Sequence, residues 1–210
     1  MKNNLLPIAK EGWIYIGYGI LSILITSLFG FEILEFFSFI ITGFFIYIFR
    51  NPERQNVIYE KNSVVSPVDG TIISIDEIKQ DSNYSYKILI DSSYLDVSLL
   101  RVPLSSSLVS IDIKHGARLS DFSPLSKKIN ENTELIFKDN ENVLKVQHML
   151  KKSIVPINVD LLIEKKLLQG SRYGVMVNGI TALYLPQNFR INVNVGDEVK
   201  ASQALIGYFS

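Results

Sequence analysis

The sequence predicts a mostly β protein whose N-terminus forms a two-helix membrane hairpin. Two uncharged apolar runs stand near the start, at Trp13 to Phe31 and Phe36 to Phe49. Beyond Arg54 the apolar stretches become short and β-branched, and they recur at about ten-residue spacing, which is typical of a β-sandwich or barrel. With 210 residues, the chain is long enough for one compact domain and a small appendage.

The two apolar runs predict helices that enter a membrane. The first run is about long enough to span a bilayer as a helix. The second reaches that length only when Ile33 to Phe49 is counted, with Glu35 near its start. Neither run has the short apolar core and small-residue cleavage site of a secretory signal. The alternatives are a hairpin that dips into the interface without spanning, and a buried hairpin of a soluble core.

Charged residues around the hairpin predict its orientation. Basic residues flank both runs on the same side: Lys2, Lys10, Arg50, Arg54 and Lys61. The link between the runs carries only acidic charge. Because basic flanks stay on the cytoplasmic side, we expect both ends of the hairpin to face the cytoplasm of a bacterial-type inner membrane. The expected units are a membrane anchor at residues 1–54 and a cytoplasmic β domain at residues 55–210.

The β domain is predicted from apolar stretches separated by Asn, Asp, Ser, Pro or Gly. The predicted strands lie, in order, at 64–75 (two strands around a turn), 85–90, 95–100, 108–114, 133–139, 142–147, 153–159, 173–186 and 189–199. A single short helix is expected, around Asp121 to Asn130. The segments 66–75 and 193–209 resemble each other and have the pattern of biotinyl/lipoyl-type β-modules, although no hairpin with a carrier lysine is present. This pattern bears on the fold alone.

The composition narrows the function classes. Lys plus Arg and Asp plus Glu both number 21, so no bulk charge favours nucleic acid. The chain has no cysteine, which excludes disulfides, Cys-ligated metals and a thiol nucleophile. Its two histidines, His115 and His148, form no metal-ligand pattern with carboxylates, and no metal is expected.

Several motifs resemble a known family. The segments "FRNPER" (49–54), "SPVDG" (66–70) and "LDVSLLRVP" (95–103) are similar to motifs of the short, membrane-anchored phosphatidylserine decarboxylases. The similarity continues through "IAKEGW" (8–13), "NENTELIF" (130–137), "GSRYG" (170–174) and the C-terminal segment 193–209. The resemblance therefore covers nearly the whole chain and implies a β domain of the phosphatidylserine decarboxylase type.

The resemblance also implies a chemistry. Members of this family make a pyruvoyl cofactor from their own chain. A Ser hydroxyl attacks the carbonyl of the preceding Gly, and elimination then splits the chain and leaves pyruvoyl on the new C-terminal fragment. The pyruvoyl forms a Schiff base with the substrate amine and accepts electrons as carbon dioxide leaves. The cleavage needs the Ser, a His base and an acid that orients the His.

The family's catalytic positions fall on three residues of this chain, and only one retains the family's residue type. The family's Asp is matched by Asp69 in "SPVDG". The position of the family's His is held by Ser98, which cannot act as a base near neutral pH. The family's cleaved Ser falls on Gly179, or on Ile180 if one gap is allowed. The self-cleavage Gly-Ser and the catalytic His are thus both missing, and Asp69 also suits a β-turn for purely structural reasons.

Other residues offer only weak replacements. Gly170-Ser171 is a Gly-Ser pair, but it lies one strand too early and aligns with a turn of the family. Thr181 is a weaker nucleophile candidate because no glycine precedes it. His115 follows a predicted strand, and His148 is expected to end one; neither stands at the family's His position.

Three functional hypotheses follow, and they leave open whether the chain is an enzyme. The first is a degenerate family member of phospholipid metabolism that forms no pyruvoyl and binds an aminophospholipid (phosphatidylserine or phosphatidylethanolamine) or regulates a partner. The second is an active decarboxylase that converts phosphatidylserine to phosphatidylethanolamine and carbon dioxide, with pyruvoyl formed from Ser171. The third is a membrane-tethered adaptor. Self-association is expected by analogy with the family, and no nucleic-acid partner is expected.

Overall fold

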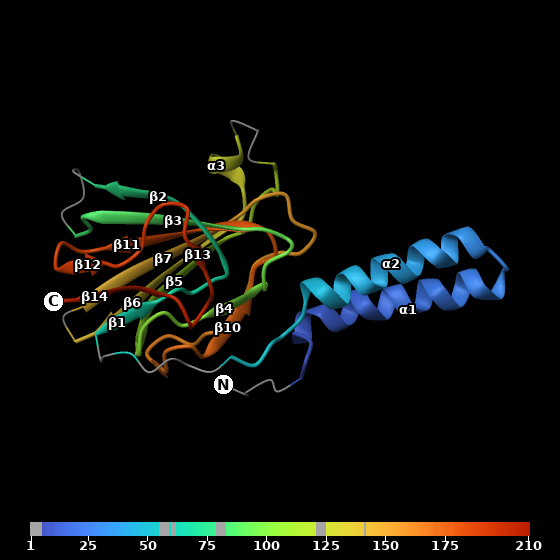
Figure 1. Cartoon of the computed structure of the whole chain (residues 1–210), viewed down its shortest axis with the longest axis horizontal. Coiled ribbons are helices and arrows are strands. Elements are labelled where there is room, and N and C mark those ends of the chain that lie inside the picture. Colours follow the sequence, from blue (N-terminus) through green and yellow to red (C-terminus); the bar gives the residue numbers. More distant parts are fainter. Residues whose placement is uncertain (1–5, 55–58, 60–61, 79–82, 121–124, 141) are drawn as a thin grey trace. The chain divides into compact units, whose positions relative to one another are not determined.

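The structure is a computed structural model that describes residues 6–54, 59, 62–78, 83–120, 125–140 and 142–210. The chain divides into two compact units, Met1–Glu53 and Arg54–Ser210. The first contains two helices and the second is mostly β (Figure 1). The predicted fold class, two N-terminal helices followed by a mostly β domain, is therefore confirmed.

The first unit is a hairpin of two apolar helices. A 3₁₀ turn, η1 (Lys10–Gly12), leads into α1 (Trp13–Leu28), and a turn with Gly30 at φ 71° leads into α2 (Glu32–Ile48). Small side chains let the helices approach closely: a Cβ on Gly19 would overlap the Thr42 side chain. The hydroxyls of Ser22 and Ser38 lie 2.9 Å apart. Close packing of small residues with polar contacts between helices is common in membrane proteins.

The outer faces of both helices are apolar and exposed. Large aliphatic and aromatic side chains project from each, among them Leu21, Leu24, Phe36, Phe39 and Ile40. By length and composition, the helical stretch Lys10–Leu28 could cross a membrane, and it is the one such helix in the described part of the chain. With 17 residues, α2 is close to the shortest helix that spans a bilayer. These features favour membrane association.

The second unit contains three antiparallel sheets. Its strands are β1 (Ser63–Val65), β2 (Gly70–Glu77), β3 (Tyr86–Ser92), β4 (Leu99–Arg101), β5 (Ser106–Lys114), β6 (Asn132–Asp139), β7 (Asn142–Leu150), β8 (Asn158–Val159), β9 (Lys166–Leu167), β10 (Arg172–Val175), β11 (Gly179–Leu185), β12 (Phe189–Ile191), β13 (Glu198–Val199) and β14 (Leu205–Phe209). The large sheet has the order β13-β2-β3-β11-β7-β6-β5-β9, and the small ones are β1-β14-β12 and β4-β10-β8.

The core of the β domain follows from alternation along the central strands. In β3, Ile88 and Ile90 are buried while their neighbours are partly exposed, and β7 buries Leu144 and Val146 in the same way. Side chains at alternate positions share one face of a sheet. Strand β11 lies between β3 and β7 in the middle of the large sheet and is buried at most positions. It therefore forms a rigid central support for residues at its ends.

The two segments that resemble each other in sequence pair with each other in space. Strand β13 pairs with β2, and β14 pairs with β1, which directly precedes the first of the two segments. The connecting turns are also linked, because Ser66 N donates to the Ala204 carbonyl and Ser202 N donates to the Ser66 carbonyl. The C-terminal strands are thus an integral part of the domain that begins near Arg54.

Some predicted elements differ from the observed ones. Residues 95 and 96 of the predicted 95–100 strand instead belong to a turn, in which the Asp96 carboxylate accepts from Ser93 N. Most of the predicted 153–159 strand is also irregular, because Pro156 and the Ser153 hydroxyl interrupt the ladder. The expected helix at 121–130 is observed as α3 (Ser126–Ile129), while 121–124 lie outside the described residues.

Candidate functional site

Asp69 lies in the turn between β1 and β2, and its carboxylate is bound by an arginine. Arg54 donates from Nη1 to Oδ1 and from Nη2 to Oδ2, each at 2.5 Å. Oδ1 also accepts from Ala201 N at 2.8 Å, and Arg54 Nη1 donates to the Ala201 carbonyl at 3.0 Å. Both side chains are only 9% exposed. The Asp69 carboxylate is therefore part of a buried, bidentate ion pair.

The backbone of Asp69 is linked to Gly179 through Ser92. The Ser92 hydroxyl donates to the Asp69 carbonyl at 2.5 Å. Ser92 is the last residue of β3, and its partner across the ladder is Gly179, the first residue of β11. The turn that carries Asp69 and the start of β11 therefore lie at the same end of the large sheet.

Ser98 lies at the same end of the large sheet, next to the small sheet β4-β10-β8. It precedes β4, is buried, and accepts at its carbonyl from Met176 N at 2.8 Å. Met176 in turn packs against Gly179, since a Cβ on Gly179 would lie 2.5 Å from the Met176 sulfur. The structure thus brings Asp69, Ser98 and Gly179 together at one end of β11. Their side chains are a carboxylate in an ion pair, a hydroxyl and a hydrogen atom.

Gly179 is tightly enclosed. The next two residues, Ile180 and Thr181, lie on opposite faces of β11. A Cβ at residue 179 would lie 2.7 Å from the Met149 carbonyl oxygen, as well as against Met176. Ile180 is half-buried, whereas Thr181 is fully buried on the opposite face of β11. A seryl side chain could not enter position 179 without displacing the backbone of β7.

Replacing Gly179 with alanine should lower the free energy of unfolding of the β domain by about 1–3 kcal/mol, because overpacking forces neighbours apart. Gly179→Ser should cost at least as much. Thermal unfolding followed by the β-sheet circular dichroism signal measures the effect. Gly43→Ala is the matched control, because nothing lies within 4 Å of its added Cβ. A Gly179→Ala protein as stable as wild type would contradict the close packing.

The Gly170-Ser171 pair lies in a turn before β10. Gly170 has φ 78°, and the Ser171 hydroxyl donates to the Leu168 carbonyl at 2.6 Å. The carbonyl oxygen of Gly170 accepts from Arg101 Nη1 at 3.0 Å. Among the described residues, no histidine or carboxylate is seen hydrogen-bonded to the Ser171 hydroxyl. At Gly170-Ser171, Arg101 polarises the Gly170 carbonyl, but no base in the described part of the chain is positioned at the Ser171 hydroxyl.

The two histidines lie in different surroundings. His115 follows β5 and is exposed. His148 lies inside β7, fully buried, with Nδ1 2.8 Å from Thr181 Oγ1 and Nε2 2.6 Å from the Tyr173 hydroxyl. Burial lowers the pKa of His148 to about 3 and raises the pKa of Tyr173. The imidazole is neutral near pH 7 and has little tendency to accept a proton, so this cluster is a polar link within the core.

Sequence reasoning missed the contact between His148 and Thr181. The signal was present, because His148 continues the buried alternation of Leu144 and Val146 in β7. Its partner could not be named, since Thr181 becomes its neighbour only through the register of β11 against β7. Within the described residues, no group of three His, Asp or Glu side chains is placed to hold a metal ion.

Comparisons with known proteins agree with this architecture. The family model described as phosphatidylserine decarboxylase matches residues 41–207. The chain is 30% identical to the phosphatidylserine decarboxylase proenzyme of Desulfotalea psychrophila, over 96% of each chain. It is 28% identical to the proenzyme of Geotalea uraniireducens over 99% of each. It is 26% identical to that of Burkholderia ambifaria over 95% of this chain and 94% of the relative. No solved structure matches.

These matches and the β domain define the class of protein: an apolar helical hairpin followed in sequence by a mostly β domain, related to decarboxylase proenzymes of phospholipid metabolism. The chain belongs to the phosphatidylserine decarboxylase family.

Proposed function

We propose that this protein is a membrane-held member of its family that remains a single chain and binds an aminophospholipid without decarboxylating it. The observation that carries the proposal is the set of side chains at the start of β11. Gly179 has no hydroxyl to attack a carbonyl, and Ser98 has no basic nitrogen. Asp69 is held by Arg54. Formation of pyruvoyl needs a nucleophile at the cleavage position and a base beside it; Gly179 supplies no nucleophile, and Ser98 supplies no base in place of the family's histidine.

The membrane location in this proposal is supported by the helices and their flanks. Helix α1 is long and apolar enough to cross a bilayer. Lys10 precedes it, and Arg50 and Arg54 follow α2, so both ends of the hairpin would lie on the cytoplasmic side. With its relatives in bacteria, the protein would belong to the inner membrane, with the β domain in the cytoplasm. A ligand drawn from that membrane would be a phosphatidylserine or phosphatidylethanolamine headgroup.

The proposal predicts that the purified, detergent-solubilised protein has one intact mass near 23.8 kDa under denaturing conditions. The mass should stay single after long incubation, because no residue at the site can start the acyl shift. The matched control is Ser171→Ala, which should behave in the same way. Two fragments in the wild type would refute the unprocessed state.

A second candidate is an active decarboxylase matured at Ser171. It is favoured by one observation, the hydrogen bond from Arg101 to the Gly170 carbonyl oxygen, which would stabilise negative charge on that oxygen during attack. In this case the mass spectrum would contain a small fragment that begins at residue 171 and is blocked at its N-terminus. Ser171→Ala would abolish the fragment, and Arg101→Met would slow its appearance.

A further inference from the structure

Two exposed loops lie at the end of β11 where the family positions meet. The first covers residues 93–97 and the second residues 151–157. The Tyr94 hydroxyl donates to the Lys152 carbonyl at 2.7 Å, which joins the loops. Asn178, the residue before Gly179, donates from its side chain to the same carbonyl at 2.6 Å. It also accepts at its own carbonyl from Lys151 N at 3.1 Å. The loops are therefore fixed beside the site.

Both loops present an aliphatic side chain to solvent. Leu95 is 66% exposed and Ile154 is 48% exposed, and the exposed Lys152 lies in the second loop beside the bond that joins them. Single exposed aliphatic residues are common on soluble proteins. Here two of them stand on adjoining loops together with a lysine. We call these three residues, Leu95, Lys152 and Ile154, the loop surface.

The acidic groups close to the loop surface are engaged. Asp96 accepts from Ser93 N at 2.7 Å and from the Ser93 hydroxyl at 2.8 Å. Asp91 pairs with Lys151. Both carboxylates are thus paired within the protein, while Lys152 is an exposed positive charge in the loop that carries Ile154.

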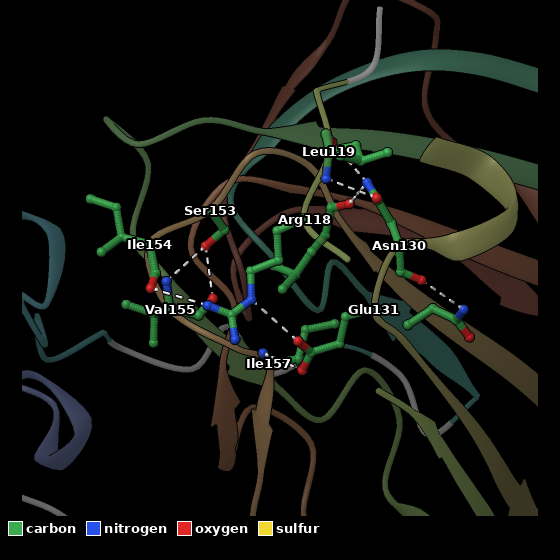
Figure 2. Close-up of polar contacts among 10 residues, drawn as sticks. Arg118, Leu119, Asn130, Glu131, Ser153, Ile154, Val155 and Ile157 are labelled. Carbon is green, nitrogen blue, oxygen red and sulfur yellow. Dashed lines mark hydrogen bonds and ion pairs between the residues drawn. The ribbon is translucent and has the colours of Figure 1, made fainter. Parts of the chain in front are cut away.

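Polar contacts hold the second loop against the rest of the β domain (Figure 2). Arg118 donates from Nη1 to the Ile154 carbonyl at 3.2 Å and pairs through Nε with Glu131 at 3.4 Å. The other oxygen of Glu131, which is nearly fully buried, accepts from Ile157 N at 3.1 Å. The Ser153 hydroxyl closes the turn by donating to the Val155 carbonyl. A loop held on both sides of Ile154 loses little conformational entropy when it binds.

We propose that the loop surface contacts the lipid bilayer, with Leu95 and Ile154 in the boundary between headgroups and acyl chains and Lys152 at the phosphates of anionic lipids. This inference rests on the membrane location in the proposed function and deepens it. The bilayer is the occupant that fits, because an apolar helix long enough to span a membrane belongs to the same chain. A pair of aliphatic side chains with an adjacent lysine also suits an anionic interface. A headgroup could then reach the start of β11 while its lipid stays in the membrane.

The absence of native cysteine allows a direct test on the full chain. Three single variants, Leu95→Cys, Ile154→Cys and Gln187→Cys, are labelled with a small fluorophore and reconstituted in nanodiscs of phosphatidylcholine and phosphatidylglycerol. A fraction of the lipids carries a nitroxide high on the acyl chain. Gln187 is the control, since it is exposed just beyond the opposite end of β11. The nitroxide should quench the labels at 95 and 154 and leave the label at 187 bright.

A charge variant completes the test. In the Ile154→Cys background, Lys152→Gln should lower the ratio of quenched to unquenched label about fivefold in anionic nanodiscs, and should leave it unchanged in pure phosphatidylcholine. Equal quenching at all three positions, no quenching at 95 and 154, or quenching that persists without nitroxide lipid would each overturn the proposal. The intact mass of the same samples tests the unprocessed state separately, because a cleaved chain with quenched loops would refute that state and retain the loop surface.

Discussion

Replacing Arg54 with methionine should lower the free energy of unfolding of the β domain by about 3 kcal/mol, because it leaves the Asp69 carboxylate without its partner in a nearly dry site. For a domain of this size the melting temperature should fall by roughly 6–12 °C. Thermal unfolding in detergent, followed by the β-sheet circular dichroism signal, measures the shift. The chain's one tryptophan, Trp13, lies in the helical hairpin and would not report on this domain.

Two variants test whether the loss arises from the ion pair. Arg190→Met removes an exposed arginine from β12 and should change stability by no more than about 0.5 kcal/mol. Adding Asp69→Asn to Arg54→Met should recover part of the loss, since a neutral amide still accepts from Ala201 N and needs no counter-charge. If Arg54→Met is no more destabilising than Arg190→Met, the pair is not holding the turn.

The second large expected effect is the loss of folding stability at low pH. His148 has a pKa of about 3 in the folded protein, against an ordinary value of 6.5. Above pH 6.5 the imidazole is neutral in both the folded and the unfolded protein, and its titration costs no folding stability. As the pH falls from 6.5 towards 3, the unfolded chain takes up a proton that the folded protein refuses. Folding stability should therefore fall by about 1.4 kcal/mol per pH unit within this window.

Urea unfolding at pH 7.5 and pH 5.5 isolates this contribution from that of the carboxylates. His148→Gln cannot titrate, so its loss of stability between the two pH values should be smaller than that of the wild type by about 1.4 kcal/mol. His115→Gln is the matched control and should keep the wild-type loss. Equal losses in the wild type and in His148→Gln would mean that the imidazole is not excluded from protonation in the folded state.

Much of the fold could be predicted from the sequence, because long alternating segments specify strands and uncharged runs specify the helices. Strands β3 and β7 fall where the alternation is sustained. The prediction was weaker at 95–100 and 153–159, where a carboxylate and a hydroxyl bind the backbone and β-favouring residues form loops. Local hydrogen bonds of this kind compete with a ladder and leave no periodic signal.

The candidate site could likewise be predicted only in part. The motifs located Asp69, Ser98 and Gly179, and the structure places them at one end of β11. The motifs could not identify Arg54 as the partner of Asp69, since that contact depends on how the turn before β2 folds against the segment at Ala201. Nor could they find the enclosure of Gly179 by Met149 and Met176, which arises from the register of β7 and from the loop before β11. The chemistry that a position allows depends on these neighbours as much as on its own residue.

The pairing of β1 with β14 also determines when the domain can be completed. Ser63 lies beside Tyr208, so β1 has no partner until β14, far along the chain, has been made. During synthesis the apolar hairpin is available early, while β1, with Val64 and Val65 in the core, stays unpaired until β14 leaves the ribosome. Contacts between such distant residues form slowly and expose unpaired strands. The newly made protein should therefore depend on chaperones until β14 has paired, and a chain truncated before β14 should be insoluble.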